Sequence, residues 1–262
     1  MTAVRNVLAI AEKEWRHYFG SPIAYVALFV WTMLFGIFFY FSFSFFLEQS
    51  MRSMGQEMGG GVKMSLNDYL IGPVIRNMAV VALFIAPMLT MRLFAEEKRQ
   101  GTIELLATAP ITDAQVVLGK FLGAVALYAL MIAAGLVNVA LLWTYAANPP
   151  EWKPVLTGAL ALLLLGSCFI SLGLFLSSLT KNQIVAGILS FCLFLGLWTL
   201  GWAEDPVAGP FMKAVAYLGV TTHMDEMAKG ILELKDVVFY LSLIVFGLFL
   251  THQSVESQRW RA

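Results

Sequence analysis

Residues 155–179 have the sequence VLTGALALLLLGSCFISLGLFLSSL, in which no side chain is charged. About 20 helical residues, at 1.5 Å each, cross the roughly 30 Å hydrocarbon core of a bilayer. Five further apolar runs surround this one, and the last of them is close to the lower length limit for crossing. The sequence therefore predicts an all-α integral membrane protein with six transmembrane helices, at residues 22–47, 74–93, 116–146, 155–179, 184–202 and 237–251.

The composition supports a membrane protein and argues against other classes. Hydrophobic residues make up 59% of the chain and charged residues 13%, which is about half the share in soluble domains. The 17 basic and 17 acidic residues balance, so no excess of positive charge suggests nucleic-acid binding. The first apolar run is too long for the core of a cleavable signal peptide, so we expect a retained first span.

Lysine and arginine residues predict the orientation. If both termini are cytoplasmic, the inside segments hold ten of the 17 basic residues and the outside segments hold seven. Basic residues are enriched on the cytoplasmic side of membrane proteins. We therefore expect a multi-pass protein with both termini in the cytoplasm.

Segments outside the six spans have helical patterns of their own. Residues 4–19 alternate apolar and charged positions at helical spacing, which predicts an N-terminal elbow helix lying in the membrane interface. Residues 203–236 predict an external hairpin of two short amphipathic helices. Pro210 would begin the first, which ends at Gly219, and Thr222 would cap the second, which ends at Gly230. Within the third span, Gly119 and Gly123 have the spacing that permits close helix approach, although such pairs also arise by chance.

The charged segment between spans two and three has its own helix signals. Glu96 and Glu97 would continue the second span into water until Gly101 ends it. Thr102 can cap a new helix over residues 102–109, and residues 112–115 (TDAQ) form a capping box that would begin span three. So short a helix is marginal alone in water, which favours docking in a groove of another protein. An ordinary connecting loop with solvated charges is the alternative.

Residues 89–123, LTMRLFAEEKRQGTIELLATAPITDAQVVLGKFLG, closely resemble the ABC-2 type permease family. The resemblance is greatest to the branch of the gliding-motility permease GldF and the nitrous-oxide-reductase maturation permease NosY. Three further pieces are similar: residues 19–25 (FGSPIAY), 177–183 (SSLTKNQ) and 228–242 (AKGILELKDVVFYLS). The resemblance thus extends over nearly the whole chain.

In that family, six spans form one half of an ABC transporter, and the loop after span two holds a coupling helix that contacts a separate ATPase. The resemblance implies that the ATPase-contact residues are Glu96, Glu97, Gly101, Thr102, Glu104, Leu105 and Leu106. It implies a second, smaller cytoplasmic contact at Ser178, Thr180, Lys181 and Asn182. The hairpin at 203–236 would correspond to the family's re-entrant helices, which help to close the external gate.

The chain has no Gly-x-x-x-x-Gly-Lys-Ser/Thr phosphate loop, so we expect no ATPase activity and no cofactor in this chain. ATP and Mg would be bound by the partner ATPase subunit. The resemblance implies two ATPase copies and a second permease half, either an identical chain or a related permease. It also implies membrane lipid around the spans, the bacterial inner membrane as location, and a GldG-like or NosD-like external partner as a further option.

The expected function is that of an exporter-type permease that moves an amphipathic or lipid-linked substrate. The alternative is a mechanotransmission subunit, which acts on an external partner protein and carries no solute. A secondary carrier working alone is disfavoured, because the spans lack ionisable groups at mid-membrane.

Four polar or sulfur side chains have two interpretations each. Asn138 and Arg76 could face a substrate cavity, but interhelical hydrogen bonding explains Asn138 and interfacial snorkelling explains Arg76. His223 and Met224 could suggest a copper relay, but an amphipathic helix explains the same pattern. We therefore predict no metal site.

Overall fold

The computed structural model describes residues 2–55, 65–102, 111–146, 150–203 and 209–259. In these ranges the chain is helical and contains no strand, which confirms the all-α fold. Six helical segments are long and apolar enough to cross a membrane, which confirms the predicted number of spans. They are Pro22–Arg52, Asn67–Gln100, Asp113–Tyr145, Trp152–Leu179, Gln183–Leu200 and Leu234–Ser257.

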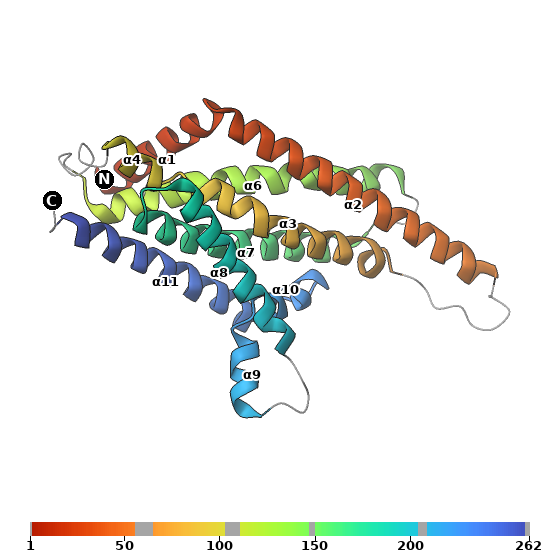
Figure 1. Ribbon diagram of the computed structural model, residues 1–262. Helices are drawn as coiled ribbons and strands as arrows, with labels where there is room; N and C mark the ends of the chain where they lie inside the picture. The colour runs from red at the N-terminus through yellow and green to blue at the C-terminus, as the bar shows by residue number, and fades with distance from the viewer. Residues whose placement is uncertain (1, 56–64, 103–110, 147–149, 204–208, 260–262) are drawn as a thin grey trace.

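The long helices lie side by side in one bundle (Figure 1). The two termini, α1 and α4 lie together at one end, and α9 projects from the bundle away from them. The described helices are α1 (Thr2–Phe19), α2 (Pro22–Gly55), η2 (Asn67–Ile71), α3 (Gly72–Thr90), α4 (Ala95–Gln100), α6 (Asp113–Tyr145), α7 (Trp152–Leu179), α8 (Gln183–Leu200), η3 (Gly201–Ala203), α9 (Pro210–Tyr217), α10 (Val220–Ala228) and α11 (Leu234–Arg259).

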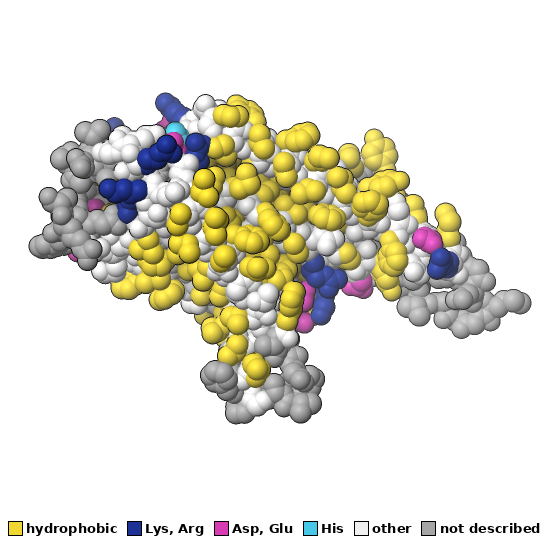
Figure 2. All heavy atoms as spheres, viewed as in Figure 1, with side chains coloured by type: hydrophobic (Ala, Val, Ile, Leu, Met, Phe, Trp, Pro, Cys, Tyr) yellow, Lys and Arg dark blue, Asp and Glu magenta, His cyan; other side chains and the backbone are white. Residues whose placement is uncertain are grey.

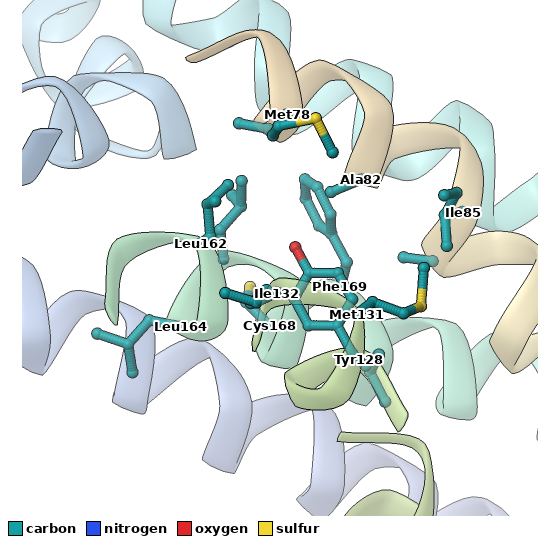
Figure 3. Close-up of a cluster of buried hydrophobic side chains, with 14 of the residues drawn as sticks. Met78, Ala82, Ile85, Tyr128, Met131, Ile132, Leu162, Leu164, Cys168 and Phe169 are labelled. Atoms are coloured by element: carbon teal, nitrogen blue, oxygen red, sulfur yellow. The ribbon is translucent and has the colours of Figure 1, made fainter. Parts of the chain in front are cut away.

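The core is centred on α7, which packs against α3, α6 and α11. Figure 3 shows side chains from α3, α6 and α7 meeting there, among them Met78, Tyr128 and Phe169. Gly166 permits this close packing, because a Cβ atom at that position would lie 2.0 Å from the Tyr128 ring. On the other side, Phe169 stacks on Phe194 of α8, with 4.5 Å between ring centroids.

The outer surface of the bundle is apolar. Phe29, Phe41, Val137, Ile188 and Val245 are each at least half exposed. Figure 2 shows hydrophobic side chains covering the bundle between the charged groups. Such a surface would be unstable in water and suits lipid, as expected for a multi-pass membrane protein.

The second span continues through Glu96 and Glu97 to Gln100, as predicted, but a turn over residues 91–94 divides it into two helices. α3 ends at Thr90, and α4 begins separately at Ala95. Ser177 of α7 explains the break. Its Oγ accepts hydrogen bonds from the N–H groups of Phe94 (3.2 Å) and Ala95 (3.1 Å), and donates to the carbonyl of Met91 (3.2 Å). A neighbouring helix thus satisfies backbone groups that a continuous helix would satisfy itself.

Two other element boundaries differ from the predictions. The last span is longer than residues 237–251, because polar residues at both ends continue α11 as Leu234–Arg259. In the hairpin, Gly219 and not Thr222 occupies the N-cap of α10. Thr222 lies inside that helix and donates a hydrogen bond to the Gly219 carbonyl at 2.8 Å.

Several local signals were predicted correctly. α2 begins at Pro22 and α9 at Pro210. Thr112 caps α6, with its side chain accepting from the Gln115 N–H. α1 is helical over the predicted segment, and its position at a membrane surface stays a prediction.

Candidate functional site

The end of the bundle that carries the termini, here called the charged end, is built around close packing of α1 on α6. Gly119 and Gly123 of α6 make this contact. A Cβ atom at Gly119 would lie 2.6 Å from Ile10 Cβ, and one at Gly123 would lie 2.9 Å from Glu14 Cβ. The glycine spacing therefore has a packing role between α6 and α1.

Lys120 lies between these two glycines and is the centre of an ion cluster. Its side chain is 1% exposed, and its Nζ lies 2.8 Å from Glu14 Oε1 of α1 and 2.8 Å from Glu97 Oε1 of α4. Lys13 of α1 completes the cluster, at 2.9 Å from Glu97 Oε1 and 3.4 Å from Glu14 Oε1. We call these four residues, Lys13, Glu14, Glu97 and Lys120, the lysine–glutamate cluster.

The cluster balances its own charge. Burial would lower the pKa of Lys13, but the hydrogen bond and charge of Glu97, together with those of Glu14, raise that pKa above its ordinary value. Lys13 therefore stays protonated at neutral pH. Two cations and two carboxylates then join three helices without leaving a buried charge uncompensated.

Glu96 is bound separately from the cluster. Its Oε2 lies 3.2 Å from Arg92 Nε and 4.0 Å from His17 Nε2. These groups, together with the cluster, line a pocket of about 370 Å³ between α1 and α4. The pocket lining is neutral overall apart from the titratable His17, because its cations and carboxylates occur in equal number.

The start of the predicted coupling helix is described, but most of that helix is not. Gly101 ends α4 in the left-handed conformation, with φ of 73°, as the sequence predicted. Thr102 Oγ1 donates a hydrogen bond to the Glu97 carbonyl at 3.3 Å. Glu104, Leu105 and Leu106 lie outside the described residues.

The predicted second contact forms the turn between α7 and α8. Ser178 is buried, and its carbonyl accepts a hydrogen bond from Lys98 Nζ of α4. Thr180 Oγ1 accepts from the Asn182 N–H at 3.1 Å, and Asn182 Oδ1 caps α8 through the Ile184 N–H at 2.9 Å. Lys181 and Asn182 are exposed. This turn therefore lies beside α4, and the two predicted contact regions are neighbours.

Comparison with known families identifies the fold. The model of the ABC-2 family transporter proteins matches residues 8–258, which is nearly the whole chain. This chain belongs to the ABC-2 family. A comparison with curated proteins found no match. As an ABC-2 protein, the chain is a membrane component without ATPase activity of its own, and it pairs with an ABC ATPase subunit.

The two side chains predicted for a cavity of this ABC-2 protein lie apart. Asn138 donates a hydrogen bond to the Gly135 carbonyl of its own helix at 3.2 Å. Arg76 is half exposed, lies 3.8 Å from Asp225, and lines an open cavity of about 1240 Å³ beside α9 and α10. Among the described residues no group of three or more His, Cys, Asp or Glu could hold a metal ion.

Sequence reasoning missed the cluster as a unit. Lys13 counted as a charged position of the helix predicted at residues 4–19. Lys13 and Lys120 also counted as basic residues on the predicted cytoplasmic side, and Glu14 was not considered. One signal was present: Lys120 is a lysine inside an apolar segment, between two glycines that allow another helix to approach. A charge at such a position needs a partner from the approaching helix.

Proposed function

We propose that this chain is the permease subunit of an exporter-type ABC complex in the bacterial inner membrane, with both termini in the cytoplasm. Two copies of the ATPase subunit bind ATP and Mg, and a second permease half, most simply an identical chain, completes the assembly. The substrate is amphipathic or lipid-linked, in keeping with the apolar and aromatic helices. The finer resemblance to the GldF and NosY branch belongs to this proposal.

The lysine–glutamate cluster is the observation that supports coupling most directly. The proposed coupling helix, residues 102–109, follows α4 after Gly101. Glu97 of α4 is held by Lys120 of α6 and by Lys13 of α1. A displacement of the coupling helix by the ATPase would therefore pass through Glu97 to α6 and α1.

This arrangement refines the proposed roles of the contact residues. The Glu97 side chain is 13% exposed, so we propose that it transmits force within the permease. Direct ATPase contact is proposed for Glu96, Gly101, Thr102, Glu104, Leu105 and Leu106. Lys181 and Asn182, which are exposed beside α4, are the proposed second contact, with Ser178 and Thr180 shaping their turn.

The test uses Glu97→Gln in the complex of permease and ATPase, reconstituted in lipid vesicles. We expect the complex to assemble and hydrolyse ATP, but to lose the ATP-dependent change in distance between spin labels on the two permease halves. Glu104→Lys, which alters the proposed contact itself, is expected to weaken ATPase binding as well.

The matched control is Glu12→Gln on α1. Glu12 is 61% exposed and pairs only with Arg16 of its own helix in the described structure, so its replacement should leave the distance change intact. A Glu97→Gln complex with a normal ATP-dependent distance change would refute the proposed transmission route.

The mechanotransmission alternative is supported by one feature, the lateral projection of α9 from the bundle (Figure 1). A projecting helix offers a binding surface to an external partner, such as a GldG-like or NosD-like protein. The two functions differ in one measurement. An exporter moves an amphipathic or lipid-linked cargo when only permease and ATPase are present, whereas a mechanotransmission subunit moves none under the same conditions.

A further inference from the structure

His223 holds together three helices far from the charged end. It lies in α10, and its Nδ1 is 2.7 Å from Asp236 Oδ1 at the start of α11. Its Nε2 is 3.0 Å from the backbone carbonyl of Tyr217, the last residue of α9. The ring also stacks on Phe239 of α11, with 3.9 Å between centroids. The imidazole thus fixes the α9–α10 hairpin to α11.

The two hydrogen bonds of His223 require an additional proton. A carbonyl oxygen only accepts, and an ionised carboxylate only accepts, whereas neutral imidazole has a single N–H. Both contacts are hydrogen bonds only if imidazole is doubly protonated, or if Asp236 carries the proton and donates it to Nδ1. In either case the pair holds one proton more than neutral histidine and ionised aspartate.

Both members of this pair are buried. His223 is 3% exposed and Asp236 is 1% exposed. Asp236 Oδ2 is buried and has no hydrogen-bond partner in the described part of the chain. If the extra proton left, a buried carboxylate would face an unprotonated nitrogen or lose its strongest donor, which is costly in an apolar environment.

The other charges nearby neutralise one another. Arg76 of α3 faces Asp225 of α10 at 3.8 Å, Lys229 pairs with Glu226 at 3.3 Å, and Lys235 pairs with Glu233 at 2.6 Å. Three other titratable groups lie near the pair. Tyr217 of α9 contacts the His223 ring edge-on, and Tyr240 of α11 donates a hydrogen bond to the Val220 carbonyl. Cys168 of α7 interacts with Tyr240. The sequence of α8 carries no charged residue. Among the described residues of this site, the net charge therefore depends on the His223–Asp236 proton.

Solvent protons can reach the pair. His223 and Asp236 both line the open cavity of about 1240 Å³, together with the three ion pairs. Figure 2 shows acidic and basic side chains gathered on this face, apart from those at the charged end. The pair therefore borders a solvent-connected cavity beside the α9–α10 hairpin, in the region here called the hairpin end.

We propose that the His223–Asp236 pair is a proton-binding site that clamps the α9–α10 hairpin onto α11. With the proton bound, both hydrogen bonds of the ring are made. When the proton leaves, one ring nitrogen presents a lone pair to an acceptor, and α10 loosens from α9 or from α11. This clamp is a property of the permease chain and holds whether or not the proposed coupling to an ATPase is correct.

The experiment follows the ¹⁵N signals of the histidine rings against pH in the full-length protein in lipid nanodiscs. The chain has three histidines, and His223→Gln identifies the signals of His223 by their loss. We expect these signals to change with pH in the wild type. Asp236→Asn keeps the size and an acceptor but removes the negative charge, so the signals of His223 should no longer follow the wild-type pH profile. Asp225→Asn, at a half-exposed carboxylate on α10, is the matched control and should leave the midpoint unchanged.

A second measurement needs no variant. Hydrogen exchange of the α9 and α10 amides in the wild type, corrected for the intrinsic effect of pH, should show opening that rises as the His223 proton is lost. Amides in the centre of α7 should show no such rise. The proposal is overturned if the His223 signals are independent of pH, if they follow the wild-type pH profile in Asp236→Asn, or if hairpin opening does not follow their titration.

Discussion

The charged end and the hairpin end are both held by buried pairs of titratable side chains, but the pairs differ in chemistry. At the charged end, Lys120 joins α6 to α1 and α4 through two glutamates. At the hairpin end, His223 joins α10 to α11 through one aspartate. Lysine and glutamate remain ionised throughout the physiological pH range when they are paired, whereas histidine changes its charge there. The proposed dependence on a proton therefore concerns the hairpin end alone.

This difference suits the proposed functions of the two ends. A connection that transmits force from an ATPase has to persist through every cycle. A hairpin at an external gate has to be released and re-formed. Three sets of substitutions test this difference between the two regions.

The largest effect is expected for Lys120→Met. The substitution leaves Glu14 and Glu97 buried without their main cation, and breaking one side of a buried pair costs about 3–5 kcal/mol. We expect the free energy of unfolding, measured by SDS titration in mixed micelles, to fall by that amount. Many molecules should also lose the packing of α1 on α6.

Lys13→Met is the matched control for this prediction. Lys13 belongs to the same cluster, but its side chain is 57% exposed, so the change should be below about 1 kcal/mol. If Lys120→Met proved as mild as Lys13→Met, the charged end would not depend on its buried pair, and the contrast between the two ends would disappear.

The sequence was sufficient for most of the fold, because span length and helix caps are local properties. Six apolar runs gave six spans, Thr112 gave the start of α6, and Gly101 gave the end of α4. The break before α4 was missed because the side chain that satisfies its backbone groups, Ser177, lies more than 80 residues away in the sequence. A tertiary hydrogen bond overrode the local helical pattern.

The sequence predicted neither of the two buried pairs of side chains, and the reason is the same for both. Glu14 and Lys120 are 106 positions apart, and nothing local shows that α1 packs on α6. His223 and Asp236 are only 13 positions apart, but the intervening turn decides whether they meet. From the sequence, His223 and Met224 were considered together as possible copper ligands. In the structure, the His223 ring contacts the Asp236 carboxylate.

A smaller effect is expected for Gly219→Ala at the hairpin end. A Cβ atom there would lie 2.3 Å from the Gly201 backbone nitrogen and 2.5 Å from Gly201 Cα, so η3 and α10 have to separate. Overpacking of this kind costs about 1–3 kcal/mol. We expect faster hydrogen exchange in α9 and α10 and little change in α1 or α6.

Gly196→Ala in the neighbouring helix α8 is the control for the glycine substitution. A Cβ atom at Gly196 meets nothing within 4 Å, and alanine is the better helix former by about 1 kcal/mol, so stability should be unchanged or slightly higher. Equal hydrogen exchange in the Gly219→Ala hairpin and the wild-type hairpin would show that the contact with Gly201 does not hold the hairpin in place.

The smallest effect is expected when a neutral hydrogen bond is removed at either end. Tyr18 donates to the Leu89 carbonyl at 2.9 Å at the charged end, and Tyr240 donates to the Val220 carbonyl at 2.6 Å at the hairpin end. Removing either hydroxyl with Tyr→Phe should lower the free energy of unfolding by about 0.5–1.5 kcal/mol, and by the same amount at pH 6 and pH 8.

The Tyr128 hydroxyl has no partner among the described residues, so Tyr128→Phe should be neutral. A loss for Tyr240→Phe that depended strongly on pH would mean that this bond, and not the histidine pair alone, responds to protons.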